Sequence, residues 1–383
     1  MIKGDKVLNA HKKKSLEFKV NQNRDLAGID QTMVYLRGCS YCRHSLSGSS
    51  LQHRIPNLNW LTMPRIVVLV SSLVLICATK LPAQTYHALP RVLELPASTR
   101  AMALGGAYMT NSPQADALFY NPALLIGVQG FGLDIQQWGP ASWTATAAAA
   151  RQWFGGGIGI GLQTLQYEAP GTGGDAAPSG QDHLFETGSV PVSERVATIG
   201  YAREIKGINL GLAIKLIEER VALRTFVSNA QTRDGVVWFD AGISKDLGRF
   251  TTSLSYQNNG ERLFAGEYRG DYHVADRLTF GISASGMQLG IFDYGITAAV
   301  TQVRKFNEGS ATIPAAGIEI GYWPIRGRTF VARAGVQRTP YYQDASPFTF
   351  GLAYWGDNLV LEWSFQGMEQ SELRTHRFGV SWR

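Results

Sequence analysis

The chain has 383 residues, with 42 glycines, 11% aromatic residues and only 17% charged residues, a composition that favours one large β-sheet unit over several smaller domains. Its net charge of +6 is unevenly distributed: residues 1–83 hold 12 basic and 4 acidic side chains, and the remaining 300 residues hold 24 basic and 26 acidic ones. The basic isoelectric point therefore gives no reason to expect a nucleic-acid partner. All three cysteines precede residue 84, so the rest of the chain has neither a thiol nor a disulfide.

Residues 63–83 are typical of a secretory signal peptide. Arg65 precedes an apolar run of 13 residues, Ile66–Ala78, well short of the roughly 20 that a membrane-spanning helix needs. The residues that follow predict cleavage after Ala83. A polar, basic stretch has no evident role upstream of a signal peptide, so we interpret residues 1–62 as a mis-assigned start or a disordered extension.

Residues 84–129 alternate poorly, and we expect them to form a hatch, or plug, rather than a spanning strand. Gly105 and Gly106 permit a close backbone approach or a positive φ, although the pair could simply make a turn. Asn121 precedes Pro122, which biases it toward an extended or turn conformation, and its amide can cap freed backbone groups.

Two charged residues of this segment, Arg100 and Asp116, are candidates for ion pairs with the wall of a barrel. The inward face of barrel strands is polar. The candidate partners on that face are Arg333, Lys215 and Glu319.

From Gly130 to Arg383 the chain reads as about fourteen short stretches of alternating apolar and polar residues. In the clearest of them, Asn358–Gln366, the odd positions from Leu359 to Phe365 are all apolar and four of the five even positions are polar. This pattern places one apolar face toward lipid and one largely polar face inward. The predicted fold is therefore all-β, a transmembrane antiparallel β-barrel of about 14 strands over residues 130–383.

The expected connectors alternate between short and long. Brief ones fall near residues 153–154, 206–207, 246–248, 285–286, 324–327 and 356–357, and the others at 169–191, 221–233, 258–273, 305–310, 338–346 and 367–372. Bacterial outer-membrane barrels have short periplasmic turns and longer outer loops. An even strand number then places both barrel termini on the periplasmic side of a cell outer membrane, with outer-membrane lipid around the barrel.

Aromatic residues gather near the expected strand ends, among them Trp138, Tyr201, Tyr322 and Trp382. Such positions predict girdles at the membrane interface, where amphipathic rings are favoured. Aromatic residues are also common in strands generally.

Two runs in the plug segment resemble a known family. They read Arg-Ala-x-Ala-Leu-Gly-Gly-Ala at residues 100–107 and Asp-Ala-Leu-Phe-Tyr-Asn-Pro-Ala at residues 116–123, and they are similar to the PorV/PorQ family of outer-membrane proteins, which is itself distantly similar to the FadL long-chain fatty-acid channels. The resemblance implies a hatch inside a fourteen-stranded barrel, with hatch residues Arg100, Leu104, Gly105, Gly106, Asp116, Asn121 and Pro122. It also implies a non-catalytic accessory role in type IX protein secretion or surface attachment, with the translocon or secreted cargo proteins as partners.

No segment has the spacing of a catalytic, metal-binding or cofactor-binding motif, so we expect neither an enzyme nor a metal or cofactor site. The glycine-rich run at residues 155–161 alternates as a strand, and its small residues would leave room for the plug.

Two alternatives to the secretion role remain open. One is a FadL-like hatch-gated channel for a hydrophobic small molecule, in which Met102, Leu118 and Phe119 would line the ligand path. Packing against the inner wall is the commoner role of such buried side chains. The other is a structural barrel that presents its outer loops to partners.

Overall fold

The computed structural model describes residues 90–108, 114–139, 142–170, 189–221, 231–259, 275–305, 309–325, 327–338, 345–368 and 375–383. The expected signal peptide, the stretch before it and most of the longer loops lie outside the described residues. In the part of the chain that is described, no helix is long and apolar enough to cross a membrane.

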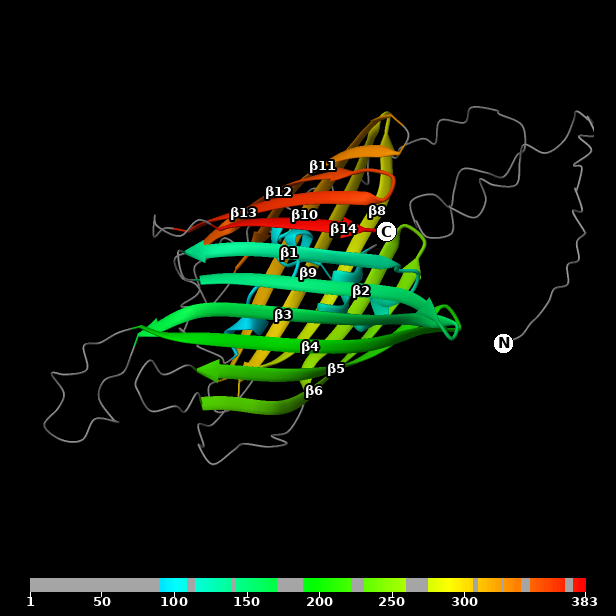
Figure 1. Ribbon diagram of the computed structural model, residues 1–383. Coiled ribbons are helices and arrows are strands. Elements are labelled where there is room, and N and C mark those ends of the chain that lie inside the picture. The colour runs from blue at the N-terminus through cyan, green and yellow to red at the C-terminus, as the bar shows by residue number, and fades with distance from the viewer. Residues whose placement is uncertain are drawn as a thin grey trace, which may run out of the picture.

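Fourteen antiparallel strands form a closed barrel, in which β1 pairs with β14 and every other strand pairs with its neighbours in sequence (Figure 1). The fold expected from the alternation is thereby confirmed. The strands are β1 (Gly130–Gly139), β2 (Ser142–Trp153), β3 (Gly156–Pro170), β4 (Ser189–Ile205), β5 (Ile208–Val221), β6 (Gln231–Leu247), β7 (Phe250–Asn259), β8 (Asp276–Leu289), β9 (Phe292–Lys305), β10 (Gly309–Ile325), β11 (Arg328–Gln337), β12 (Ala345–Trp355), β13 (Leu359–Met368) and β14 (His376–Trp382).

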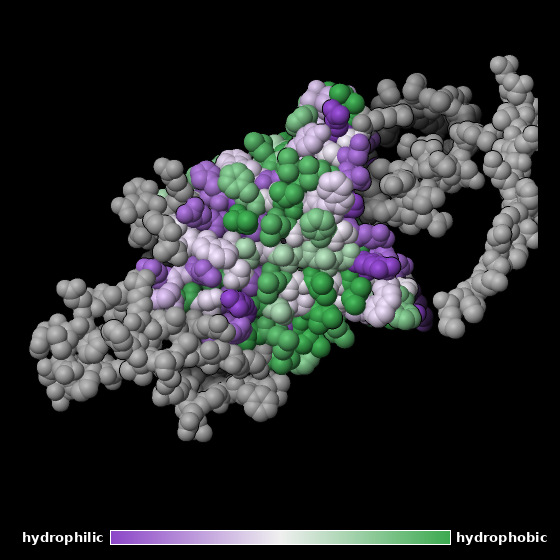
Figure 2. All heavy atoms as spheres, viewed as in Figure 1, coloured by the Kyte–Doolittle hydropathy of each residue, from purple (hydrophilic) through white to green (hydrophobic). Residues whose placement is uncertain are grey.

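The strands turn most of their large apolar side chains outward, and their inward side chains are mostly small or polar. In β1, Phe131, Leu133 and Ile135 are exposed on the outer wall, whereas Asp134 and Gln136 are buried in the lumen. Figure 2 shows the result on one face of the barrel as an apolar band across the middle, with hydrophilic residues toward both ends. An exposed apolar band of this kind is suited to the hydrocarbon of a bilayer.

One end of the barrel carries only short hairpins, as the connector lengths predicted. Lys206 and Gly207 alone join β4 to β5. The C-terminus lies at this same end, which we call the short-turn end (Figure 1), because the Arg383 amide donates to the Asn358 carbonyl between β12 and β13. The opposite end, with the longer connectors, is the long-loop end.

The turn expected at residues 285–286 is wrong. Strand β8 continues to Leu289, and the hairpin is made by Gly290 and Ile291. Gly286 has a φ of +72°, and the pairing of β8 with β9 shifts register between Ala284 and Met287. Ser285 and Gly286 mark a β-bulge inside the strand. Bulges and turns favour the same residue types.

Four short helical elements lie inside the barrel (Figure 1): η2 (Arg91–Leu93), α2 (Thr99–Ala103), η3 (Ala115–Phe119) and η4 (Pro122–Leu125). We call residues 90–108 and 114–129 the plug. Local caps define its helices, since Ser98 accepts from the Ala101 amide at 3.3 Å and Asn121 accepts from the Ala123 amide at 3.0 Å. Pro122 stands at the first position of η4, where it costs no hydrogen bond.

The plug runs along the lumen from the long-loop end to the short-turn end. At its start, the Val92 amide donates to Glu194 at 2.7 Å, near the long-loop end of β4. At its end, the Leu125 carbonyl accepts from Gln152 at 3.3 Å, next to the β2–β3 hairpin. The plug therefore spans much of the length of the barrel interior.

Candidate functional site: the plugged lumen

The inner wall has no side chains at many points where the plug contacts it, because the lumen-facing residues there are glycines. A Cβ atom at Gly200 would lie 2.5 Å from Leu118 Cδ1, and one at Gly159 would lie 2.9 Å from Leu125 Cδ2. Real Cβ atoms do not approach other heavy atoms within 3.0 Å. The same holds at further wall glycines that face plug residues: Gly157, Gly161, Gly211, Gly242, Gly317, Gly335, Gly351 and Gly379.

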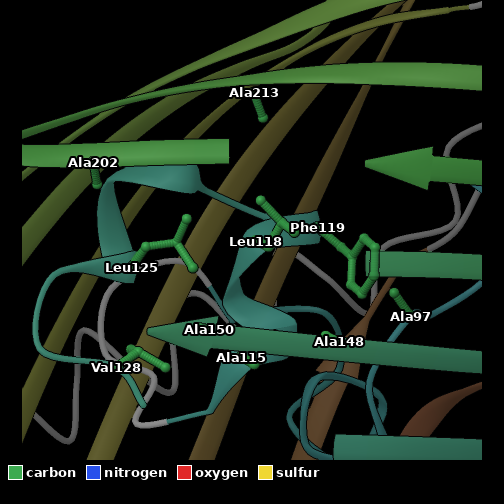
Figure 3. Close-up of a cluster of buried hydrophobic side chains, with 10 residues drawn as sticks. All are labelled: Ala97, Ala115, Leu118, Phe119, Leu125, Val128, Ala148, Ala150, Ala202 and Ala213. Carbon is green, nitrogen blue, oxygen red and sulfur yellow. The ribbon is translucent and has the colours of Figure 1, made fainter. Parts of the chain in front are cut away.

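An apolar cluster joins the plug to strands β2, β4 and β5 (Figure 3). Leu118, Phe119 and Leu125 of the plug point at small wall residues, which include Ala202 and Ala213. Leu118 is completely buried and Phe119 is 6% exposed. The wall thus provides small residues where the plug provides large ones, which is the shape match of a packed core.

Wall side chains also satisfy carbonyl groups of the plug backbone. Gln257 donates to the Phe119 carbonyl at 2.7 Å, and Ser255 donates to the Tyr120 carbonyl at 2.8 Å. On the other side of the lumen, Thr349 donates to the Ala103 carbonyl at 3.1 Å. Strands β7 and β12 therefore hold the plug from two directions, and each bond removes a buried acceptor that would otherwise be costly.

A buried ionic network ties α2 to strands β10, β11 and β13. Arg100 of the plug lies 3.1 Å from Glu319 of β10. Glu319 also accepts from Arg333 of β11 at 2.6 Å, and Arg333 reaches Glu362 of β13 at 2.7 Å. Gln114 of the plug donates to the other Glu362 oxygen at 3.0 Å, so both halves of the plug join one network.

A second polar contact fastens α2 to the seam between β1 and β14. The Thr99 amide donates to Asp134 of β1 at 2.7 Å, and the Thr99 hydroxyl donates to the same oxygen. Arg377 of β14 donates to the Ala97 carbonyl at 2.9 Å. The plug thus bridges the first and last strands of the barrel.

Asp116 sits deep in the plug, where burial raises its pKa above the ordinary value of 3.8 for an aspartate. The nearby Glu362 acts in the same direction, whereas hydrogen bonds from Ser98 and Tyr108 and the charge of Arg100 act against it. The Tyr108 hydroxyl donates to Asp116 at 2.8 Å.

The structure brings most of the sequence-derived plug residues together inside the lumen. Of the candidate ion pairs, the one between Arg100 and Glu319 is present, whereas Lys215 pairs instead with Asp240 of the wall at 2.8 Å. Gly105 and Gly106 have φ values of +63° and +80°, which matches the positive φ that the glycine pair allowed.

The remaining sequence-derived residues are buried. Asn121 is fully buried and donates to the Ile243 carbonyl at 3.4 Å, and Pro122 is buried in η4. Met102 and Leu104 are 2% and 3% exposed. Leu118 and Phe119 are buried as well. A role of Met102, Leu118 and Phe119 in lining a ligand path stays a prediction.

Sequence reasoning missed Asp134, Arg377 and Tyr120. Arg377 is completely buried, and the Tyr120 hydroxyl accepts from the Ala97 amide at 2.9 Å. Asp134 and Arg377 each stand at an inward position of an alternating strand. A charged residue at such a position was the signal that would have drawn attention to them.

The long-loop end of the lumen holds a second apolar cluster, which we call the mouth cluster. Its buried members are Val92, Leu165, Val196, Ile217 and Trp238, and the partly buried Leu93, Leu95 and Tyr167 pack against them. Strands β3 to β6 supply the wall part of this cluster, and η2 together with Leu95 supplies the rest. An apolar surface therefore lies inside the barrel at the end with the long loops.

No protein-family model matches the chain, and the comparison with curated proteins gives no match. Similar solved structures include the toluene transporter TodX of Pseudomonas putida, with 14% identity, a TM-score of 0.47 and coverage of 78% of this chain and 98% of TodX. They also include the toluene transporter TbuX of Ralstonia pickettii (12%, 0.42, 74% and 97%) and a FadL homologue of Pseudomonas aeruginosa (12%, 0.43, 75% and 98%). At such identities and TM-scores these likenesses assign no function to this chain. None of these three is a PorV- or PorQ-type protein.

Proposed function

We propose that the chain is a non-catalytic barrel of a cell outer membrane, closed to ions by its own plug, that admits a small hydrophobic molecule. The outward apolar band supports the membrane location. With the short hairpins on the periplasmic side, both barrel termini would face the periplasm, from which an exported chain inserts.

The mouth cluster carries the proposal for the ligand class. The lumen of a water-filled pore is polar, but here Trp238, Leu165 and Ile217 are buried in an apolar cluster with plug residues at the long-loop end. A ligand would reach them by displacing the start of the plug. A hydrophobic molecule would gain roughly 25 cal/mol for each Å² of apolar surface it removes from water there. Because Leu118 and Phe119 fill the lumen below, passage would require the plug to shift.

A reversible lock on the plug tests this route. A Cβ atom at Gly379 would lie 3.2 Å from the Thr99 Cβ, slightly inside the separation of about 3.5–4.5 Å found in disulfides. It would also lie 2.7 Å from Asp134 Oδ1, so the Asp134 side chain has to shift by a few tenths of an ångström for the bond to form. The double variant Thr99→Cys/Gly379→Cys, with the three natural cysteines changed to serine, would join α2 to β14.

The measurement is uptake of a fluorescent long-chain fatty acid, and separately of toluene, into proteoliposomes. Uptake should stop when the double variant is oxidised and return on reduction, whereas each single variant should be indifferent to redox state. Uptake that continues with the plug locked would refute passage past the plug.

A second candidate is the PorV/PorQ-type accessory role in type IX secretion. It is favoured by the position of the run at residues 116–123, which lies inside the lumen with all but the half-buried Tyr120 buried. If this plug is a fixed part of the scaffold, the working surface is outside the barrel. A deletion strain should then retain secreted cargo in the periplasm, and the locked variant should restore export. A source genome without a type IX translocon would eliminate this candidate.

A further inference from the structure

Three consecutive hairpins at the short-turn end carry a basic residue at the same place. The basic residue lies three positions before the first residue of the turn: Arg151 in β2, Arg203 in β4 and Lys245 in β6. All three are exposed. Because these turns mark the same end of the barrel (Figure 1), equal spacing from them places the three cations at a similar depth in the membrane.

The three side chains point away from the lumen. The residue just before each cation faces inward and is buried, namely Ala150, Ala202 and Ser244. Side chains alternate along a strand, so Arg151, Arg203 and Lys245 lie on the outer wall.

Large apolar side chains lie on the same outer face, two residues closer to each turn. Trp153, Ile205 and Leu247 are 53%, 50% and 53% exposed. The cations are therefore bordered by apolar surface on the side away from the membrane centre as well as toward it. Such a mixture of basic and apolar groups suits the headgroup zone of a bilayer, where long basic side chains reach phosphate while their stems stay in contact with apolar groups.

Neighbouring acidic residues do not neutralise this strip. Glu204 and Asp246 directly follow Arg203 and Lys245 in sequence and so point to the opposite, lumen side. Asp246 accepts a hydrogen bond from Thr251 at 2.7 Å. Within the described ranges, Arg151, Arg203 and Lys245 make no ion pair.

Two outward-facing cations in the described part of the long-loop end are different, because each has an acidic partner. Arg195 lies 3.8 Å from Glu218, and Arg304 lies 3.0 Å from Asp276. Arg151, Arg203 and Lys245 at the short-turn end thus differ from Arg195 and Arg304 in having no acidic partner among the described residues.

We propose that Arg151, Arg203 and Lys245 form a binding strip for anionic phospholipid headgroups in the leaflet at the short-turn end. Each cation would meet a lipid phosphate, Arg151 and Arg203 with two parallel N–H donors and Lys245 as a point charge. The strip would fix the height and tilt of the barrel in the membrane, independently of what passes through the lumen.

The test compares lipid retention by the folded protein in nanodiscs made of equal amounts of phosphatidylglycerol and phosphatidylethanolamine. Native mass spectrometry after release should show phosphatidylglycerol enriched roughly fivefold for each cation, the gain expected for a basic residue near an anionic surface. The triple variant Arg151→Gln/Arg203→Gln/Lys245→Gln should bring the retained lipids back toward the bulk ratio.

The matched control is Arg195→Gln/Arg304→Gln, which removes outward cations that have protein partners and should leave the enrichment unchanged. Equal loss in the control, or persistence in the triple variant, would overturn the proposal. If the triple variant does not fold, the same lipid measurement is made on the single variants and on the wild-type chain.

In the wild-type chain, phosphatidylglycerol enrichment should fall as NaCl rises from about 0.05 to 0.5 M, because salt screens exposed charges. Enrichment unaffected by salt would count against the strip.

Discussion

A methyl group added at Gly161 should destabilise the protein because it collides with the plug. The new Cβ would lie 2.7 Å from Phe119 Cε1 and 3.3 Å from Leu118 Cδ2, so the ring must move. Its neighbours in the apolar cluster leave little room for that, and overpacking of this kind costs about 1–3 kcal/mol. The expected loss for Gly161→Ala is therefore about 1–3 kcal/mol in the free energy of unfolding.

Gly132→Ala is the matched control on the same inner wall. Its Cβ would approach nothing closer than Ser381 Cβ at 3.4 Å, an ordinary contact. Replacing a glycine whose conformation alanine can adopt stabilises by about 0.4–1 kcal/mol through the unfolded chain. This variant should be unchanged or slightly more stable.

A double-mutant cycle with Phe119→Ala isolates the contact. Alone, that truncation should cost about 3–5 kcal/mol, but it also makes room for the methyl group at residue 161. The double variant should therefore be more stable than the sum of the single effects predicts, by about 0.5–3 kcal/mol. Urea unfolding in lipid vesicles, followed by tryptophan fluorescence, provides all four values. Strict additivity, or a Gly161→Ala variant as stable as Gly132→Ala, would show that the plug is not seated as described.

Two further predictions concern the buried charges of the plug. Glu319→Gln should lower the free energy of unfolding by about 3–5 kcal/mol, because it leaves the guanidinium groups of Arg100 and Arg333 buried with less compensating charge. Asp276→Asn, in the exposed pair with Arg304, should lower it by less than about 1 kcal/mol. Similar losses of the two variants in urea titrations would contradict the network. Burial raises the folded-state pKa of Asp116 above 3.8, so its protonation favours the folded state: this contribution is complete below the unfolded-state pKa and is lost as pH rises through the folded-state value. Asp116→Asn should accordingly be at least as stable as the wild type at neutral pH and lose that advantage in acid, and a pH-independent difference between the two stability curves would speak against a raised pKa.

The strands were predictable because their signal is local. Alternation along Leu359–Phe365 and the brief connector at Lys206–Gly207 follow from neighbouring residues, and the structure has a strand and a hairpin there. The bulge at Gly286 was misread for the same reason, since bulges and turns share residue preferences. Only the pairing with β9 distinguishes them.

The contacts of the plug were less accessible from sequence. The plug and the wall meet across separations as large as 280 residues, as between Ala97 and Arg377, and one sequence holds no record of which inward position meets which plug residue. The pair between Arg100 and Glu319 was among the candidates because both residues are charged and Glu319 faces inward. The backbone of Leu104 and Gly105 lies close against Gly335. This contact depends on the register of strands far from the plug in sequence.

Conductance in a planar lipid bilayer tests the closed lumen most directly. The structure places a packed, hydrogen-bonded plug along the barrel interior, so the purified wild-type chain should insert without producing stepwise ion currents in about 1 M KCl, while a general-diffusion porin inserted under the same conditions produces them. Stable open steps of a size typical of water-filled barrels, seen with the wild-type chain, would contradict the account.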